Sequence, residues 1–222
     1  IQNNPDRPSK RLWTENNAGT HLKHYTAIDE HAEASFIIET MQKEHLEKHR
    51  PYGDMAVLYR MNAQSRVIEE ALVRRGIGYT MVGGTRFYDR AEIRDMLAYL
   101  KVINNFKDNI SLARIINTPK RGIGGTTVEK LLDYANAGGM SMFEGIMGIE
   151  GSGLSSATQR KLTNFSAMIF DFLNASTEMN VFELIQKVMT DTKYLAHLQE
   201  SKDPQAQSRE ENLGELLSVA KD

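Results

Sequence analysis

The sequence predicts an α/β segment followed by an all-α segment. In the first 84 residues, apolar runs of strand length alternate with helical patterns, whereas the residues after 108 show helical spacing only. The 222 residues are 41% hydrophobic and include no cysteine, a composition that can form sizeable cores without disulfides. A partial parallel β-α-β-α-β unit followed by a helical domain is therefore expected, with the boundary between residues 84 and 108.

The α/β segment is predicted from the alternation of its elements. In chain order these are a strand over 22–28, a helix over 29–46, a strand over 55–60, a helix over 63–76 and a strand over 79–84. Asp29 is placed to cap the first helix and Gly76 to end the second. Because crossover helices join the strands, the sheet should be parallel. Three strands make an incomplete sheet, which should leave a strand edge and an apolar face uncovered.

Beyond residue 84, apolar side chains recur every three or four residues, as along the buried face of an amphipathic helix. The pattern predicts helices over 89–105, 110–117, from 126 onward, over 155–174 and 180–190, and a last one with Leu213, Leu216 and Leu217. Capping-box spacing occurs at Asp89 and Glu92, at Thr126 and Glu129, and at Ser141 and Glu144.

Charge is distributed unevenly along the chain. The formal net charge is −2, but residues 60–131 carry 13 basic and 7 acidic side chains, whereas residues 132–222 carry 7 basic and 13 acidic. A basic zone on a near-neutral chain is typical of local phosphate contact, although a solvated charge imbalance has the same pattern. No run approaches the roughly 18 apolar residues of a membrane helix. Since the chain begins at Ile1 rather than methionine, we expect it to be part of a longer protein.

The stretch TPKRGIGGTTVEKL, residues 118–131, lies at the end of the basic zone. Pro119 should end a helix, and Gly122 to Gly124 should form a hairpin with a buried isoleucine and positive φ at Gly124. Backbone N–H groups would then open at a helix N-terminus, where anions bind, with both cations outside the core. The pattern predicts a helix-hairpin-helix that grips a duplex backbone through Lys120, Arg121, Gly122, Ile123, Gly124, Gly125, Thr126 and Thr127.

The alternative interpretation of this stretch is a plain glycine turn between two packed helices. A weaker echo of the motif occurs at residues 151–162. Other signatures are absent from the sequence: it has no Walker A loop and no nucleophile elbow. His45 and His49 lie four residues apart on a predicted helix, and His21 and His24 lie near each other, but there is no cysteine and no H-E-x-x-H motif. No catalytic residue, cofactor site or metal site is therefore expected. Polar residues do follow the apolar run 55–60, at the carboxyl end of a predicted parallel strand, where α/β sheets bind ligands.

Several longer blocks carry a resemblance to a known family. They are AVLYRMNAQSRVIEEAL, YTMVGGTRFYDRAEIRDMLAYLKVI, SLARIINTPKRGIGGTTVEKL and AQSREENLGELLSVAKD, in this order. Together they closely resemble the superfamily 1A DNA helicases of the UvrD/Rep/PcrA group, and in particular the PcrA branch of Gram-positive bacteria. The resemblance implies that residues 1–105 are the first half of the second RecA-like core domain and that residues 106–222 are the helical accessory domain inserted into it.

The resemblance also implies roles for individual residues. Arg60 and Asn62, with Arg66 close by, match positions implied to contact single-stranded DNA. Residues 120–127 match the duplex-contacting motif, and Arg90 falls with Arg86 in a family motif implied to serve coupling or packing. The Walker motifs, the adenine-binding glutamine and the arginines that meet the γ-phosphate are expected outside this chain, so the chain alone should hydrolyse no ATP.

For the parent protein, the resemblance implies an ATP-dependent helicase that unwinds duplex DNA 3′ to 5′ in repair or replication, with ATP and Mg²⁺ as cofactors. Implied partners are single-stranded DNA, the duplex junction, the remainder of the helicase, and repair or replication proteins, in a bacterial cytoplasm at the nucleoid and away from membranes. Self-association through the incomplete sheet is a further expectation.

Two other functions fit parts of the pattern. The helical domain could be a protein-interaction or autoinhibitory module of the helicase without direct DNA contact. A repair glycosylase also carries such hairpins, but it needs a catalytic aspartate well downstream, whereas Asp133 follows the hairpin by a few residues on the same helix.

Overall fold

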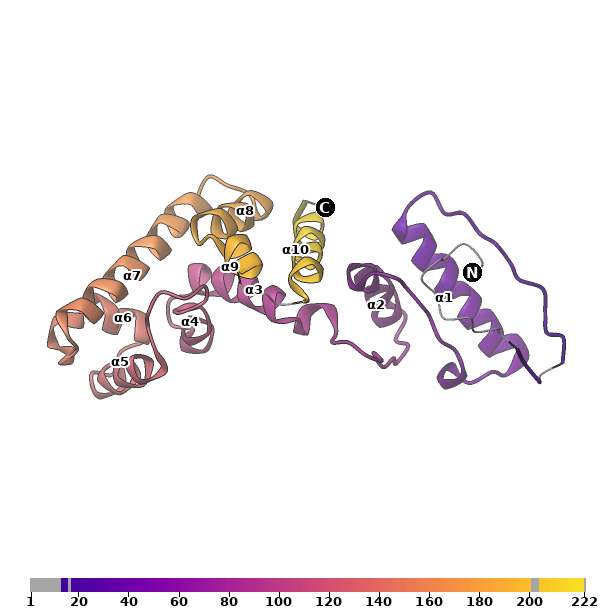
Figure 1. Cartoon of the computed structure of the whole chain (residues 1–222), viewed down its shortest axis with the longest axis horizontal. Coiled ribbons are helices and arrows are strands. Elements are labelled where there is room, and N and C mark those ends of the chain that lie inside the picture. Colours follow the sequence, from indigo (N-terminus) through magenta and orange to yellow (C-terminus); the bar gives the residue numbers. More distant parts are fainter. Residues whose placement is uncertain (1–12, 16, 201–203, 222) are drawn as a thin grey trace.

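The computed structural model describes residues 13–15, 17–200 and 204–221. Its α-helices are α1 (Glu30–Lys48), α2 (Ser65–Arg74), α3 (Ala91–Asn104), α4 (Asn109–Ile115), α5 (Gly125–Ala137), α6 (Met142–Met147), α7 (Ser156–Ser176), α8 (Val181–Asp191), α9 (Tyr194–Glu200) and α10 (Ala206–Lys221). Short 3₁₀ turns are η1 (Tyr52–Asp54), η2 (Asn62–Gln64), η3 (Phe87–Asp89) and η4 (Ile149–Ser152). The molecule is elongated, with α1 and α2 at one end and α5 to α7 at the other (Figure 1).

The larger of two hydrophobic cores belongs to the helices after residue 86, which we call the helical body. Its central element is α3, which packs against α4, α7, α8 and α10. Apolar side chains at helical spacing on α3 explain this position, because Ile93, Tyr99 and Val102 are all fully buried. The same core takes Phe172 from α7 and Leu213 from α10. The last helix therefore returns to the first helix of the body and closes it.

The smaller core lies between α1 and α2, which we call the N-terminal body. Its buried residues are Ile38, Leu72 and Ile77. Partly buried side chains cover this cluster, namely Met41, Tyr52, Ile68, Ala71 and Tyr79. A core of this size has few layers, and much of its apolar periphery remains in contact with solvent.

The predicted parallel β-α-β-α-β unit is wrong for this structure. Within the described ranges no residue lies in a strand, and residues 22–28, 55–60 and 79–84 contain no stretch of regular secondary structure. The two crossover helices are present as α1 and α2. The all-α part of the fold prediction matches the helices observed beyond residue 90.

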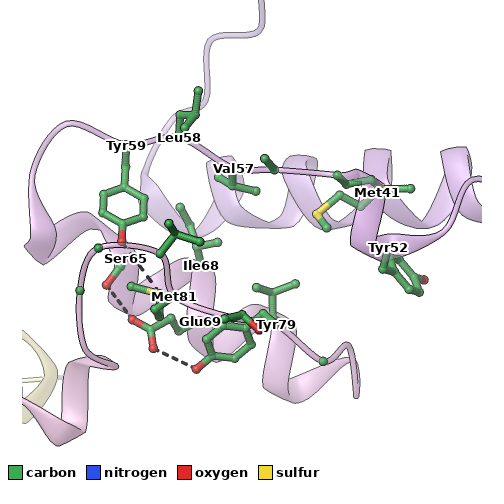
Figure 2. Close-up of a pocket in the computed structure, with 18 of the residues that line it drawn as sticks. Met41, Tyr52, Val57, Leu58, Tyr59, Ser65, Ile68, Glu69, Tyr79 and Met81 are labelled. Atoms are coloured by element: carbon green, nitrogen blue, oxygen red, sulfur yellow. Dashed lines mark hydrogen bonds between the residues drawn. The ribbon is translucent and has the colours of Figure 1, made fainter.

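The missing sheet has a physical reason, because a strand is stabilised by hydrogen bonds to a neighbouring strand and by side chains packed on its faces. Segments 55–59 and 78–84 instead line opposite parts of a pocket of about 820 Å³, shown in Figure 2. Tyr59 Oη reaches Met81 Sδ at 3.9 Å, and this is a side-chain contact. Leu58 and Val82 are 94% and 93% exposed, respectively. Apolar patterning alone does not hold these segments in a sheet.

Local capping signals were predicted with mixed success. Asp29 caps α1 by accepting from Ala32 N at 2.7 Å, and Ser141 forms a capping box with Glu144 at the start of α6, as predicted. Gly76 has φ +67° just after α2, which is the left-handed backbone that ends a helix. The boxes predicted at Asp89 and Thr126 are wrong, because α3 and α5 begin after Arg90 and Gly124 without a side-chain cap.

Candidate nucleic-acid interface

The hairpin between α4 and α5 is held from inside by one asparagine and one isoleucine. Asn117 Oδ1 accepts from Arg121 N at 2.7 Å and from Ile123 N at 3.2 Å. The Ile123 side chain is 1% exposed and belongs to the core of the helical body. The turn is therefore anchored on its inner side, while Gly122, Gly124 and Gly125 face solvent.

Gly122, and not Gly124, adopts the left-handed conformation in this turn. Its φ is +67°, whereas Gly124 has φ −80° and ψ 168°. The expectation of positive φ at Gly124 is therefore wrong by two residues. Lys161, on α7, donates from Nζ to Gly122 O at 3.0 Å. A Cβ at Gly122 would lie 2.7 Å from that ammonium nitrogen and would displace the flexible end of Lys161, so the positive φ is the main reason that glycine suits this position.

The N-terminus of α5 is open to solvent. Gly124 is its N-cap and provides no side-chain hydrogen bond. The first backbone N–H groups of α5 that donate within the helix are those of Thr127 and Val128, and both donate to Gly124 O. In the described part of the chain, no hydrogen bond uses the N–H of Gly125 or Thr126. Such amides, together with the helix dipole, attract an anion.

The two cations of the motif have different surroundings. Lys120 is exposed. Arg121 turns inward: Nη1 donates to Ile115 O at 2.9 Å and to Pro119 O at 3.1 Å, and Nη2 donates to Tyr99 Oη at 2.6 Å. Its guanidinium also lies 5.4 Å from the centre of the Phe165 ring. The expectation that both cations lie outside the core is therefore wrong for Arg121, because the turn offers it backbone carbonyls and an aromatic face.

Tyr99 completes the inner side of the hairpin. Its hydroxyl donates to Thr118 O at 2.5 Å while accepting from Arg121. Burial raises the pKa of Tyr99 to about 12, although the nearby guanidinium of Arg121 opposes that rise. The phenol therefore stays protonated at neutral pH and can act as donor and acceptor at once.

The predicted single-strand residues lie in the N-terminal body and are not brought together with the hairpin. Arg60 is exposed, and Asn62 Nδ2 donates to Ser208 Oγ of α10 at 3.2 Å. Arg66 is buried, and its Nε donates to Glu215 at 2.6 Å. The same guanidinium bonds Glu70 at 3.1 Å. The Arg66 guanidinium is thus paired with two carboxylates, whereas the Arg60 side chain faces solvent.

The remaining motif residues also have clear positions. Arg86 lies over the Tyr79 ring at 5.2 Å, and Arg90 is buried at the start of α3. In the weaker motif at 151–162, Ser155 accepts from Thr158 N at 3.3 Å and caps α7. That helix start is therefore less open than the start of α5.

Two residues of the hairpin region were missed by sequence reasoning. Asn117 could have been noticed, since an asparagine before a turn commonly bonds backbone N–H groups a few residues on. Lys161 could not, because its bond to Gly122 joins residues 39 positions apart. No group of three or more metal-binding side chains occurs in the residues that the structure describes. None of the described helices has the length and apolar character needed to cross a membrane.

The structure thus combines a helical body that carries an open Gly-Ile-Gly hairpin with the helix pair α1 and α2. A family model described as "UvrD-like helicase C-terminal domain" matches residues 1–222, and the chain belongs to that family.

The chain is 42% identical over 221 residues to the protein named ATP-dependent DNA helicase PcrA in Bacillus subtilis (strain 168). It is 41% identical over 222 residues to proteins of the same name in Staphylococcus epidermidis and Staphylococcus aureus. The predicted resemblance to the UvrD/Rep/PcrA group is thereby confirmed. Each match covers 100% of this chain, which spans about 30% of the length of the curated relatives.

Proposed function

We propose that this chain is the DNA-contacting portion of an ATP-dependent 3′–5′ DNA helicase and that its hairpin holds the duplex. The observation that carries the proposal is the open N-terminus of α5, preceded in the hairpin by the exposed Lys120 and by Gly122, whose carbonyl oxygen accepts from Lys161. The relatives, which are named DNA helicases, support the same function.

The proposed duplex contact involves the phosphate backbone only. The amides of Gly125 and Thr126, the dipole of α5 and the Lys120 ammonium all attract phosphate and none of them distinguishes bases. Gly124 and Thr127 lie on either side of these amides. Arg121, Gly122 and Ile123 contribute by fixing the turn. Duplex binding should therefore be independent of sequence and strongly dependent on salt.

The loop that follows residue 59 is the proposed contact for single-stranded DNA. Arg60 and Asn62 are exposed there, so a guanidinium and an amide can meet a phosphate and a sugar or base edge. Arg66 follows this loop at the start of α2 and pairs with Glu215 of α10. Rotation of the helical body would then be coupled to the single-strand contact.

We propose the division of the chain into residues 1–105, half of a RecA-like domain, and 106–222, the accessory domain. ATP and Mg²⁺ would be bound by other parts of the parent helicase, and the 222-residue chain alone should not hydrolyse ATP with or without DNA. Turnover above a buffer blank, measured by phosphate release, would contradict this. Under the same proposal, the parent helicase would unwind duplex junctions during repair or replication, at the nucleoid in the bacterial cytoplasm.

The proposal is tested by titrating salt against duplex binding, measured by fluorescence anisotropy. Lys120→Glu should weaken binding about equally for unrelated sequences and lower the log–log salt slope by about 1. Lys43→Glu is a matched control, because Lys43 is 68% exposed on α1, far from the hairpin in sequence. If Lys120→Glu binds duplex like the wild type, the hairpin is only a helix turn, and the interaction-module function gains support.

The single-strand contact is tested separately with labelled oligo-dT. Arg60→Ala should weaken binding of the single strand and leave duplex binding by the hairpin unchanged. A guanidinium can serve any phosphate, so the same variant is also placed in the parent helicase. Unchanged single-strand affinity with lost ATP turnover would assign Arg60 to the nucleotide instead.

A further inference from the structure

A buried polar junction joins the last helix of the chain to the loop that bears Arg60 and Asn62. At its centre, Arg90 Nη1 donates to Asn212 Oδ1 of α10 at 2.6 Å. Arg90 is 7% exposed and Asn212 is 3% exposed. The two residues are 122 positions apart, so the junction exists only when α10 is docked.

The Asn212 amide has one orientation in this site. Its oxygen accepts from Arg90, while its Nδ2 donates to Glu92 Oε1 at 2.6 Å. A flipped amide would set NH₂ against a guanidinium and oxygen against a carboxylate, and both contacts would repel. Arg209 lies 3.9 Å from the second oxygen of Glu92. Asn212 therefore bridges the Arg90 guanidinium and the Glu92 carboxylate.

Arg90 also bonds to the loop that bears Arg60 and Asn62. Its Nη2 donates to Asn62 O at 3.0 Å and to Ser65 Oγ at 2.8 Å. The Ser65 hydroxyl in turn donates to Glu69 at 2.6 Å, so its position is also fixed. Arg90 thus holds the backbone of the loop at one end and the first residue of α2 at the other.

The loop is closed by its own glutamine. Gln64 Oε1 accepts from Arg60 N at 3.2 Å and from Met61 N at 3.0 Å. Asn62 has a second tie to α10 through Ser208 Oγ. Ser208, Asn212 and Glu215 follow each other by four and three residues, so they share one face of α10, and that face contacts the N-terminal body.

We infer that Asn212 is a positioning residue for the loop of residues 60–64, acting through the guanidinium of Arg90. This rests on the proposed contact between that loop and single-stranded DNA. Arg90 is buried, and its hydrogen-bond acceptors are neutral oxygens. Loss of the bond to Asn212 Oδ1 would leave part of a buried cation without an acceptor, which is energetically costly. The helical body thereby sets the shape of the proposed single-strand contact from the opposite end of the sequence.

The test compares two substitutions at position 212 with a matched change on the same face of α10. Asn212→Ala removes the bridge, and Asn212→Asp sets a carboxylate against Glu92. Glu215→Gln is the control, because Glu215 pairs with Arg66, and in the described part of the chain no hydrogen bond joins it to Arg90. The readout is amide hydrogen exchange. The rates at Arg60 and Met61 report on the loop, because both amides donate to Gln64, and the rates in α7 show whether the helical body stays folded.

Both Asn212 variants should speed exchange at the Arg60 and Met61 amides by about tenfold or more and weaken oligo-dT binding by a similar factor. They should leave exchange in α7 and affinity for duplex DNA unchanged. Glu215→Gln should leave the loop amides unchanged. If Glu215→Gln loosens the loop as much, or if α7 exchange rises equally, Asn212 only docks α10 and the inference is overturned. If the wild type does not bind oligo-dT, the single-strand function fails while the exchange data still decide the positioning role.

Discussion

The helical body and the N-terminal body contain similar local patterns but differ in how completely they are packed. In the helical body, apolar faces of all the described helices from α3 to α10 meet in one core. In the N-terminal body, three of the described residues form the buried core, and residues such as Leu58 remain 94% exposed. The difference shows that strand-like patterning needs partner strands, whereas amphipathic helices can complete a core among themselves.

The comparison extends to polar groups. Arginines of the helical body and its junction, Arg90 and Arg121, are ordered by carbonyl, hydroxyl and amide oxygens. In the N-terminal body, buried Arg66 is ordered by the carboxylates of Glu70 and Glu215, whereas Arg60 faces solvent. Burial turns a cation into a structural element when acceptors converge on it, and exposure leaves it available for a ligand.

The largest expected effect comes from removing one core side chain in each body. Phe172→Ala should destabilise the helical body by about 3–5 kcal/mol, and Leu72→Ala should destabilise the N-terminal body by about 2 kcal/mol. Hydrogen exchange of α7 and α1 measures the two bodies separately. Equal loss of protection in α7 and α1 after Leu72→Ala would mean that the bodies unfold as one unit, and the comparison would fail.

The second expected effect separates the two cations of the hairpin. Arg121→Ala leaves Ile115 O, Pro119 O and Tyr99 Oη without their donor, which should cost on the order of 3 kcal/mol. Lys120→Ala should change the free energy of unfolding by about 0.5 kcal/mol or less. Urea unfolding of both variants decides the matter. Equal stability of the two would place Arg121 on the surface with Lys120.

The third expected effect is a loss of stability at alkaline pH. The pKa of Tyr99 is about 12 in the folded protein and 10.0 as the reference value, so its contribution is fully present below pH 10. That contribution falls as pH rises from about 10 to about 12 and amounts to on the order of 3 kcal/mol. Urea midpoints from pH 9 to 12 should decline less steeply for Tyr99→Phe than for the wild type. Identical slopes would contradict the assignment to Tyr99.

The smallest expected effect distinguishes two glycines of the turn. Gly122→Ala places a side chain at φ +67° and against Lys161, which should cost about 1–2 kcal/mol. Gly124→Ala has φ −80° and open space, so it should cost only about 0.5 kcal/mol, for a poorer residue at the N-cap. Melting curves of both variants give the comparison. A larger loss for Gly124→Ala would show that the turn strain lies at that residue.

The helices were largely predictable from the sequence. The spacing over 155–174 and 180–190 corresponds to α7 and α8 within one or two residues at each end. The short helix α9 was not predicted, since seven residues give little periodicity. The hairpin residues were predicted as a group, but the roles of Arg121 and Arg66 were not distinguishable from those of exposed cations.

The sequence by itself determined the amphipathic helices, the cap at Asp29 and the glycine turn before α5, because these depend on residues within about one helical turn of each other. Only the tertiary structure decided that the three apolar segments form no strands, that Arg121 and Arg66 point inward, and that Lys161 lies on Gly122. Those outcomes depend on acceptors and neighbours that lie far away along the chain. Asn212 and Arg90, 122 residues apart, meet because α10 packs back against α3, and no local pattern encodes that meeting.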